Sequence, residues 1–182
     1  MASKPRIRQD ARDMVWSLGA VFGVVALLLA ISYRPHAQTV QVVDYQGAIE
    51  TATSASNWPI LVPSSIPTGY SVTNARFEPE TYGGNGDARW YLGLSDSGTN
   101  YISLWQSDGL SNKVIAAATN HGDCQTTVQI QGVTWDKCEV AEPLTRSFVR
   151  IVDTQTIVVS GTAPWNALEA FASSLSAQPL KH

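Results

Sequence analysis

The hydrophobic residues near the N-terminus form one unbroken apolar segment, unlike those in the rest of the chain. Residues 14–33 are twenty consecutive positions without a charged side chain. Twenty helical residues at about 1.5 Å each match the ~30 Å hydrocarbon core of a bilayer. Trp16 and Tyr33 stand near the two ends of this segment, and amphipathic rings favour the headgroup level. The pattern therefore predicts a transmembrane helix over residues 14–33.

The charged residues around this segment predict its orientation. Four of the five flanking cations precede it, so the positive-inside rule puts residues 1–13 in the cytoplasm and the main domain outside. A cleaved signal peptide is the alternative, but its apolar core is about 7–15 residues long and ends in small residues. Here Pro35 occupies a position that should be small. We therefore expect an uncleaved, single-pass anchor in the cell membrane.

Small residues recur along one side of the predicted anchor, at Gly19, Gly23, Ala26 and Ala30. Such residues allow a second helix to approach closely. An integral membrane protein complex is therefore a candidate partner besides the lipid bilayer. The same spacing also arises by chance in apolar segments rich in Gly and Ala, so both interpretations stay open.

Beyond the anchor, alternating and helical hydrophobic patterns predict one small α+β domain. Residues 34–57 are interpreted as a polar juxtamembrane linker and a helix capped by Asp44. Residues 58–182 predict an extracytoplasmic domain with an antiparallel sheet flanked by helices. The predicted extended segments are 59–63, 70–77, 89–94, 101–106, 146–152 and 156–160, with a helical turn over 113–118. A terminal amphipathic helix is predicted with Thr162 as cap, Pro164 in its first turn, and Leu168, Phe171, Ala172 and Leu175 as its buried stripe.

Two of the predicted strands alternate in phase. A loop around residues 97–98 pairs Leu92 with Leu104. The same register pairs Leu94 with Ile102. The opposite face then carries Tyr91, Tyr101 and Trp105. We expect the terminal helix to cover this face, because that helix needs an apolar partner. The alternative is an exposed interaction surface, because aromatic residues are favoured at protein interfaces.

Cys124 and Cys138 are the only cysteines, and both lie in the part predicted to be exported, where disulfides persist. The residues between them predict a β-hairpin. If its loop is Ile130-Gln131-Gly132, with Gly132 in the left-handed position, the two cysteines face each other. A metal or redox pair is the alternative, but it lacks C-x-x-C spacing and nearby histidines. We therefore predict a structural disulfide.

The remaining residues carry no recognisable catalytic pattern. From Ala37 onward seven Lys or Arg stand against thirteen Asp or Glu, a net charge of −6, which argues against nucleic acid as a partner. A lone His121 near Asp123 is most simply a loop residue. Glu78, Glu80 and Asp87 around Gly83-Gly84-Asn85-Gly86 resemble one calcium-binding turn, but such turns work as arrays. We expect no catalytic residue, no cofactor and no metal site, and therefore no enzyme.

Several short landmarks resemble a known family. They are Trp16 with the apolar segment, residues 63–69, Trp90-Tyr91-Leu92-Gly93, and Gly161-Thr162-Ala163 before the last helix. Together they resemble the actinobacterial single-pass membrane proteins of domain-of-unknown-function family 4245. The resemblance implies an actinobacterial source and the same anchored topology, and it assigns no activity. The leading hypothesis is a non-catalytic accessory or scaffold protein of the cell envelope beside a membrane complex. The alternative is a binding module for an envelope glycan or lipid, which exposed coplanar aromatic rings or an apolar cavity would favour.

Overall fold

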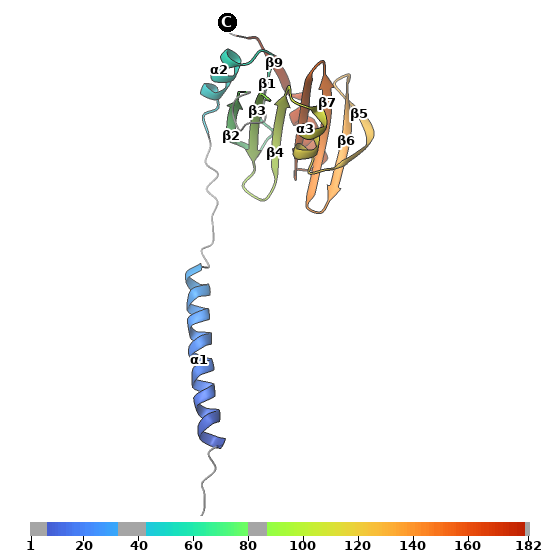
Figure 1. Ribbon diagram of the computed structural model, residues 1–182. Coiled ribbons are helices and arrows are strands. Elements are labelled where there is room, and N and C mark those ends of the chain that lie inside the picture. Colours follow the sequence, from blue (N-terminus) through green and yellow to red (C-terminus); the bar gives the residue numbers. More distant parts are fainter. Residues whose placement is uncertain (1–6, 33–42, 80–86, 181–182) are drawn as a thin grey trace, which may run out of the picture. The chain divides into compact units, whose positions relative to one another are not determined.

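The structure, a computed structural model, describes residues 7–32, 43–79 and 87–180, which belong to two separate compact units (Figure 1). The first unit contains helix α1 (Ile7–Ser32), which includes most of the predicted anchor. Its apolar side chains that the structure describes, such as Trp16 and Phe22, are exposed. Among the residues with described side chains, no helix is both long and apolar enough to cross a membrane. The second unit contains all of the described strands.

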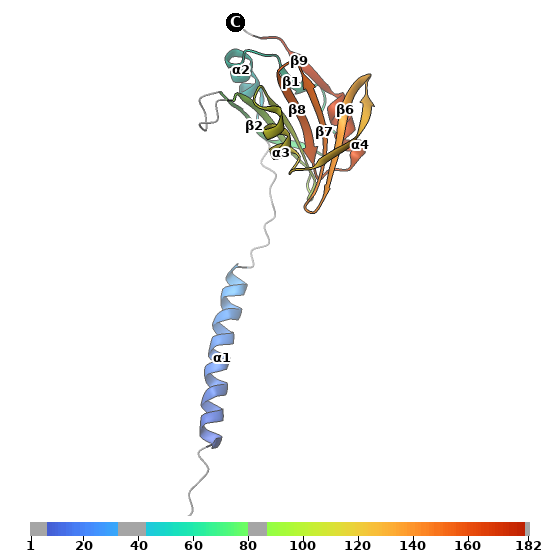
Figure 2. The same ribbon diagram turned by 45° about the vertical axis from the view of Figure 1, so that its right-hand side comes forward.

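The second unit is built on a seven-stranded antiparallel sheet (Figures 1 and 2). Its strand order is β2-β3-β4-β8-β7-β6-β5. In sequence the strands are β2 (Ser71–Glu78), β3 (Arg89–Ser95), β4 (Tyr101–Ser107), β5 (Asp123–Ile130), β6 (Val133–Ala141), β7 (Leu144–Val152) and β8 (Gln155–Gly161). Leu92 lies opposite Leu104, and Leu94 lies opposite Ile102, as predicted. The α+β class with an antiparallel sheet is therefore confirmed.

One face of this sheet forms the main core. Trp90 and Leu104 point into it from the sheet, and Leu168 and Phe171 join them from helix α4 (Trp165–Ser173). All four side chains are fully buried. Helix α4 therefore packs on the face opposite to Tyr91 and Trp105, and the expectation that the terminal helix covers those aromatic rings is wrong. The helix follows its larger apolar partner, because this face carries the continuous row of aliphatic side chains.

The other face is covered in part by helix α3 (Ser111–Ala118), which lies over β7 and β8. Ala118 packs there against Val149 and Val158, together with the buried sulfur side chain of Cys138. The register of the strands continues this row from Val158 to Trp105 on β4. Ile115 of α3 and Trp105 of β4 both pack against this cluster, so the cover reaches β4. Helix α2 (Gln46–Ala55) contacts β2 and adds Ala52 to the main core on the other side.

The chain after α4 differs from the prediction. The helix ends at Ser173, and Leu175 begins strand β9 (Leu175–Gln178), which pairs with β1 (Ile60–Pro63) in a separate two-stranded sheet. Pro164 occupies the N-cap position rather than Thr162. The Thr162 hydroxyl instead accepts a hydrogen bond from the backbone N–H of Tyr101. It fixes the start of β4 and does not cap the helix.

Two buried side chains attach β1 to the large sheet. Gln106, on β4, accepts a hydrogen bond from the Leu61 N–H at 2.9 Å and donates to the Pro59 carbonyl at 2.8 Å. The Trp90 indole donates to the Leu61 carbonyl at 2.9 Å. Because a buried backbone group without a partner is costly, these contacts fix the position of a strand that the large sheet does not pair.

Helix α2 (Gln46–Ala55) also belongs to this unit, although the sequence analysis grouped it with the linker. It begins one residue later than predicted, and the Asp44 carboxylate accepts a hydrogen bond from the Gln46 N–H at 3.1 Å. Ala52 is fully buried in the main core, with Ile49 packed beside it. The helix ends before Asn57, as predicted.

Candidate functional site

A row of aromatic and arginine side chains crosses β2, β3 and β4 on the face of the sheet that α3 covers in part. Arg76 on β2 lies opposite Tyr91 on β3, which lies opposite Trp105 on β4. The Arg76 guanidinium stands 4.6 Å from the centre of the Tyr91 ring, and that ring meets Trp105 edge-on at 5.1 Å and 87°. The Arg89 guanidinium stands 5.6 Å from the Trp105 ring. We call Arg76, Arg89, Tyr91 and Trp105 the aromatic–arginine face.

Glu78 holds both guanidinium groups in place on this face. Its carboxylate lies 2.8 Å from the Arg76 Nε and 3.7 Å from an amino group of Arg89. The Glu78 side chain is 19% exposed, against 44% for Arg76. Pairs with such partial exposure add little stability. Their effect here is to orient two cations over two aromatic rings before any partner binds.

Tyr91 links this row to the third predicted residue, Tyr101. A side chain at position 93 would meet the Tyr91 ring at 3.2 Å, so Gly93 leaves the space that the ring occupies along the strand. Burial raises the pKa of Tyr91, the Arg76 charge lowers it, and Tyr101 raises it again. Tyr101 is 40% exposed. Tyr91 and Trp105 are thus in contact, whereas Tyr101 lies further along β4 on the same face.

A cavity of about 240 Å³ lies between the aromatic–arginine face and α3. Its lining comprises Asp87, Arg89, Trp105, Lys113, Val114 and Ala117. Trp105 lines this cavity, and its indole N–H donates a hydrogen bond to the Ser103 hydroxyl at 3.2 Å. The lining combines two cations, one carboxylate and an aromatic ring. A polypeptide side chain of mixed character fits this chemistry better than a purely apolar ligand does.

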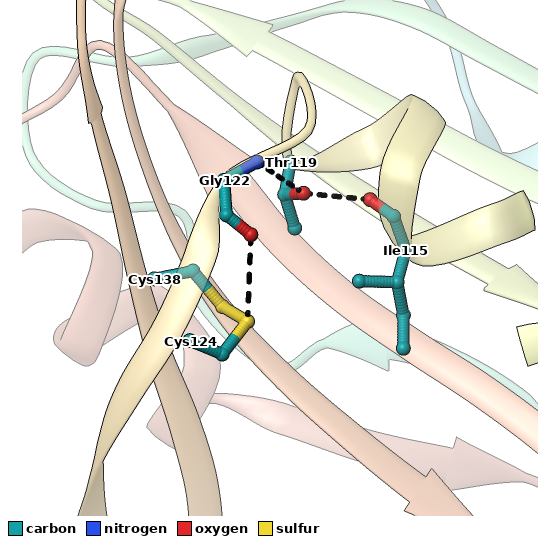
Figure 3. Close-up of a disulfide and its surroundings, with 5 residues drawn as sticks. All are labelled: Ile115, Thr119, Gly122, Cys124 and Cys138. Carbon is teal, nitrogen blue, oxygen red and sulfur yellow. Dashed lines mark hydrogen bonds between the residues drawn. A yellow bond between two sulfur atoms is a disulfide. The ribbon is translucent and has the colours of Figure 1, made fainter. Parts of the chain in front are cut away.

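The two cysteines form the predicted disulfide (Figure 3). The predicted three-residue loop is wrong, because the turn has two residues, Gln131 and Gly132, both with positive φ. A bulge between Cys124 and Thr126 shifts the register by one residue and restores the opposition of Cys124 and Cys138. The disulfide between Cys124 and Cys138 was therefore predicted correctly, but the prediction lacked the bulge and assumed a longer turn.

The disulfide lies beside the end of α3. Figure 3 shows the Gly122 N–H donating to the Thr119 hydroxyl at 3.1 Å, and that hydroxyl donating to the Ile115 carbonyl at 2.8 Å. Cys138 is fully buried, and Cys124 on the edge strand is exposed. The bridge thus joins the edge strand β5 to β6, whose Cys138 packs in one cluster with Ala118 at the end of α3.

The other residues singled out by the sequence do not gather into a site. His121 is an exposed loop residue with a φ of 61°. In the described parts of the chain no group of three or more His, Cys, Asp or Glu could hold a metal ion. Glu78 pairs with arginines, while Glu80 and residues 83–86 lie outside the described residues. Gly19, Gly23 and Ala26 are exposed on α1, and the side chain of Ala30 is not described.

Sequence reasoning missed the two arginines of the aromatic–arginine face. Arg76 and Arg89 entered the sequence analysis only in the count of charged residues, yet Arg89 and Tyr91 are two residues apart and therefore share one face of β3. That alternation was the available signal. The contribution of Arg76 required the pairing of β2 with β3, which the sequence did not specify.

The structure also bears on the glycan or lipid alternative. Tyr91 and Trp105 are nearly perpendicular, so this pair is no flat platform for a sugar ring. A second cavity, of about 240 Å³, lies beside Trp58 and Phe77, but its lining includes Asn57 and Asp108 as well as apolar groups. Neither feature has the coplanar or apolar character that favours such a ligand.

Comparisons with known proteins give a family and little more. A family model described as "Protein of unknown function (DUF4245)" matches residues 6–175. No curated protein matches the chain. Among solved structures, MucB in complex with MucA(peri) has 16% identity and a TM-score of 0.38, covering 65% of this chain and 36% of that one. The Pseudomonas aeruginosa MucA/MucB complex has 16% identity and a TM-score of 0.39, covering 65% and 35%. The chain thus spans about a third of those structures, and similarity at this level supports no conclusion about function.

Proposed function

The chain belongs to the DUF4245 family of proteins of unknown function, and we propose from its own residues that it is a non-catalytic accessory protein of the cell envelope. An N-terminal helix anchors it in the membrane with residues 1–13 in the cytoplasm. The α+β domain lies on the outer side and binds a partner protein through the aromatic–arginine face. The partner belongs to a membrane protein complex.

The anchor is supported by the uncharged segment from residue 14 to residue 33 and by the cations that precede it. The disulfide supports an outer location for the domain, because such bridges persist in oxidising compartments and are rare in the cytosol. The stripe from Gly19 to Ala30 supplies a surface on which a helix of the complex can pack.

The observation that carries the binding proposal is the composition and order of the aromatic–arginine face. Tyr, Trp and Arg are the residue types that contribute most to protein–protein binding. Glu78 and the two rings hold Arg76 and Arg89 in one arrangement, so binding loses little side-chain entropy. A surface that is ordered beforehand and partly apolar suits a protein partner better than a catalytic role, for which acid, base and nucleophile sets are needed.

Photo-crosslinking from single positions tests the binding proposal. A photoreactive amino acid is placed at Tyr101, which is 40% exposed beside the face, and separately at Leu144, which is 38% exposed. Leu144 alternates onto the other side of the sheet, so it is a matched control. We expect irradiation of intact cells to give a discrete protein adduct from position 101 and none of the same mass from position 144.

A charge reversal at Arg76 then tests the role of the face. Arg76→Glu should remove the adduct because it places a like charge beside Glu78 and leaves the Tyr91 ring without its cation, while the exposed position keeps the fold intact. Adducts of equal yield from both photoreactive positions would contradict a specific surface. An adduct with lipid or glycan in place of protein would favour the alternative binding module.

A further inference from the structure

The two edge strands of the large sheet, β2 and β5, differ in how well they are protected against pairing with another strand. At one edge β2 carries Arg76 and Glu78, and its Val72 carbonyl accepts a hydrogen bond from the Val43 N–H at 3.0 Å. At the other edge β5 has eight residues, and its only charged side chain is Asp123 at its start. Within the described chain, no backbone group of β5 is hydrogen-bonded to a loop or helix. Natural sheets usually block such edges with charges, prolines or covering segments.

The outward groups of β5 follow from its hairpin. With a two-residue turn, Ile130 and Val133 form the hydrogen-bonded pair next to the turn, and the pairs then alternate. Thr127 and Gln129 consequently direct their N–H and C=O groups away from β6. The bulge near Cys124 interrupts only the start of the strand, and the register from Thr126 to Ile130 is regular.

The sequence of this edge is close to a palindrome. Residues 125–129 read Gln-Thr-Thr-Val-Gln, so an antiparallel copy centred on Thr127 pairs Thr127 with itself and Thr126 with Val128. Pairs of β-branched residues stabilise antiparallel strands, and a two-fold contact requires a surface that is complementary to itself. This register also brings the outward groups of Thr127 against those of the second strand.

The absence of charged side chains from residues 124–130 favours a second copy of this strand over a charged partner. Two copies of a chain whose outer part carries a net charge of −6 repel each other except where the contact surface is neutral. Residues 124–130 supply such a neutral strip, and six of the eight β5 residues are exposed. We propose that β5 pairs antiparallel with β5 of a second copy about a two-fold axis at Thr127, which joins two sheets edge to edge.

Cysteine crosslinking of the full chain in its membrane tests this pairing. In the proposed register the two Thr127 Cα atoms are about 5.5 Å apart, within the range that a disulfide bridges. The two Gln129 Cα atoms are four residues out of register, at least about 13 Å apart. After mild oxidation by copper phenanthroline, Thr127→Cys should therefore give about ten times more covalent dimer than Gln129→Cys, an equally exposed variant on the same strand. Peptide mapping confirms that Cys124 and Cys138 remain joined.

Amide hydrogen exchange on the unmodified chain provides a second test that no variant can disturb. We expect the amides of Thr127 and Gln129 to exchange at least about tenfold more slowly when the chain is concentrated in vesicles than when it is diluted in excess lipid. Equal crosslinking of the two cysteine variants would indicate random collision and overturn the proposal. The absence of crosslinking at position 127, or amide exchange that is independent of dilution, would overturn it as well.

Discussion

Replacing Gln106 by Leu should strongly destabilise the outer domain, although Leu has a similar size and is apolar. Gln106 is 1% exposed. Its carboxamide satisfies the Leu61 N–H and the Pro59 carbonyl, and it donates to the Gln155 side chain at 2.8 Å. In Gln106→Leu both backbone groups, whose hydrogen bonds are partly buried, lose this partner, at up to about 1–3 kcal/mol each, whereas the half-buried Gln155 can turn to water. We therefore expect a loss of about 2–5 kcal/mol.

The assay is thermal unfolding of the full chain, followed by tryptophan fluorescence and near-UV circular dichroism. One kcal/mol moves the midpoint of a domain of this size by about 2–5 °C, so the expected fall is on the order of 10 °C. Gln46→Leu makes the same chemical change at an exposed position on α2 and should shift the midpoint by less than about 2 °C. If Gln106→Leu is as stable as the control, the hydrogen bonds of Gln106 do not hold β1, and the reasoning about this strand fails.

Three further predictions concern the disulfide, a buried glycine and an acidic turn. Replacing Cys124 and Cys138 with Ser should lower the free energy of unfolding by about 3 kcal/mol in urea titrations, because the denatured chain gains freedom; an unchanged midpoint would refute this. Gly161→Ala should cost about 1–3 kcal/mol, since the added methyl group meets the backbone of β4, and a neutral result would contradict that close packing. The Asn100 side chain and turn N–H groups lower the pKa of Asp96, so its contribution to stability is complete above the ordinary value of 3.8 and is lost as pH falls through the lowered value. Asp96→Asn should therefore flatten the acid limb of the stability curve, and an unaltered limb would count against this role.

The strands were predictable where alternation is strict and the partner is near in sequence. Leu92 and Leu104 share a buried face, and a short loop leaves them one natural register. Strand β9 was missed because Leu175 continues the helical spacing of Leu168 and Phe171, and only its pairing with β1 ends the helix. The hydrophobic pattern of one segment does not indicate which strand it pairs with when that strand lies more than a hundred residues away in the sequence.

The candidate site was predictable only in part, for the same reason. Alternation put Tyr91 and Trp105 on one face, but it could not reveal which helix covers that face. The main core attracted α4 to the other side, and the shorter α3 lies over β7 and β8 and reaches Trp105. Gln106 was not singled out, although alternation puts it on the same face of its strand as Leu104. Its role depends on β1, which approaches from a distant segment.

The location of the domain outside the membrane is the claim on which the proposed function depends most directly, and topology reporters measure it. A reporter that is active only in the cytoplasm is fused either before Lys4 or after His182 in the full chain. The account predicts an active N-terminal fusion and an inactive C-terminal fusion, because the cations before residue 14 keep that end inside. An active reporter after His182 would put the domain in the cytoplasm and contradict the account.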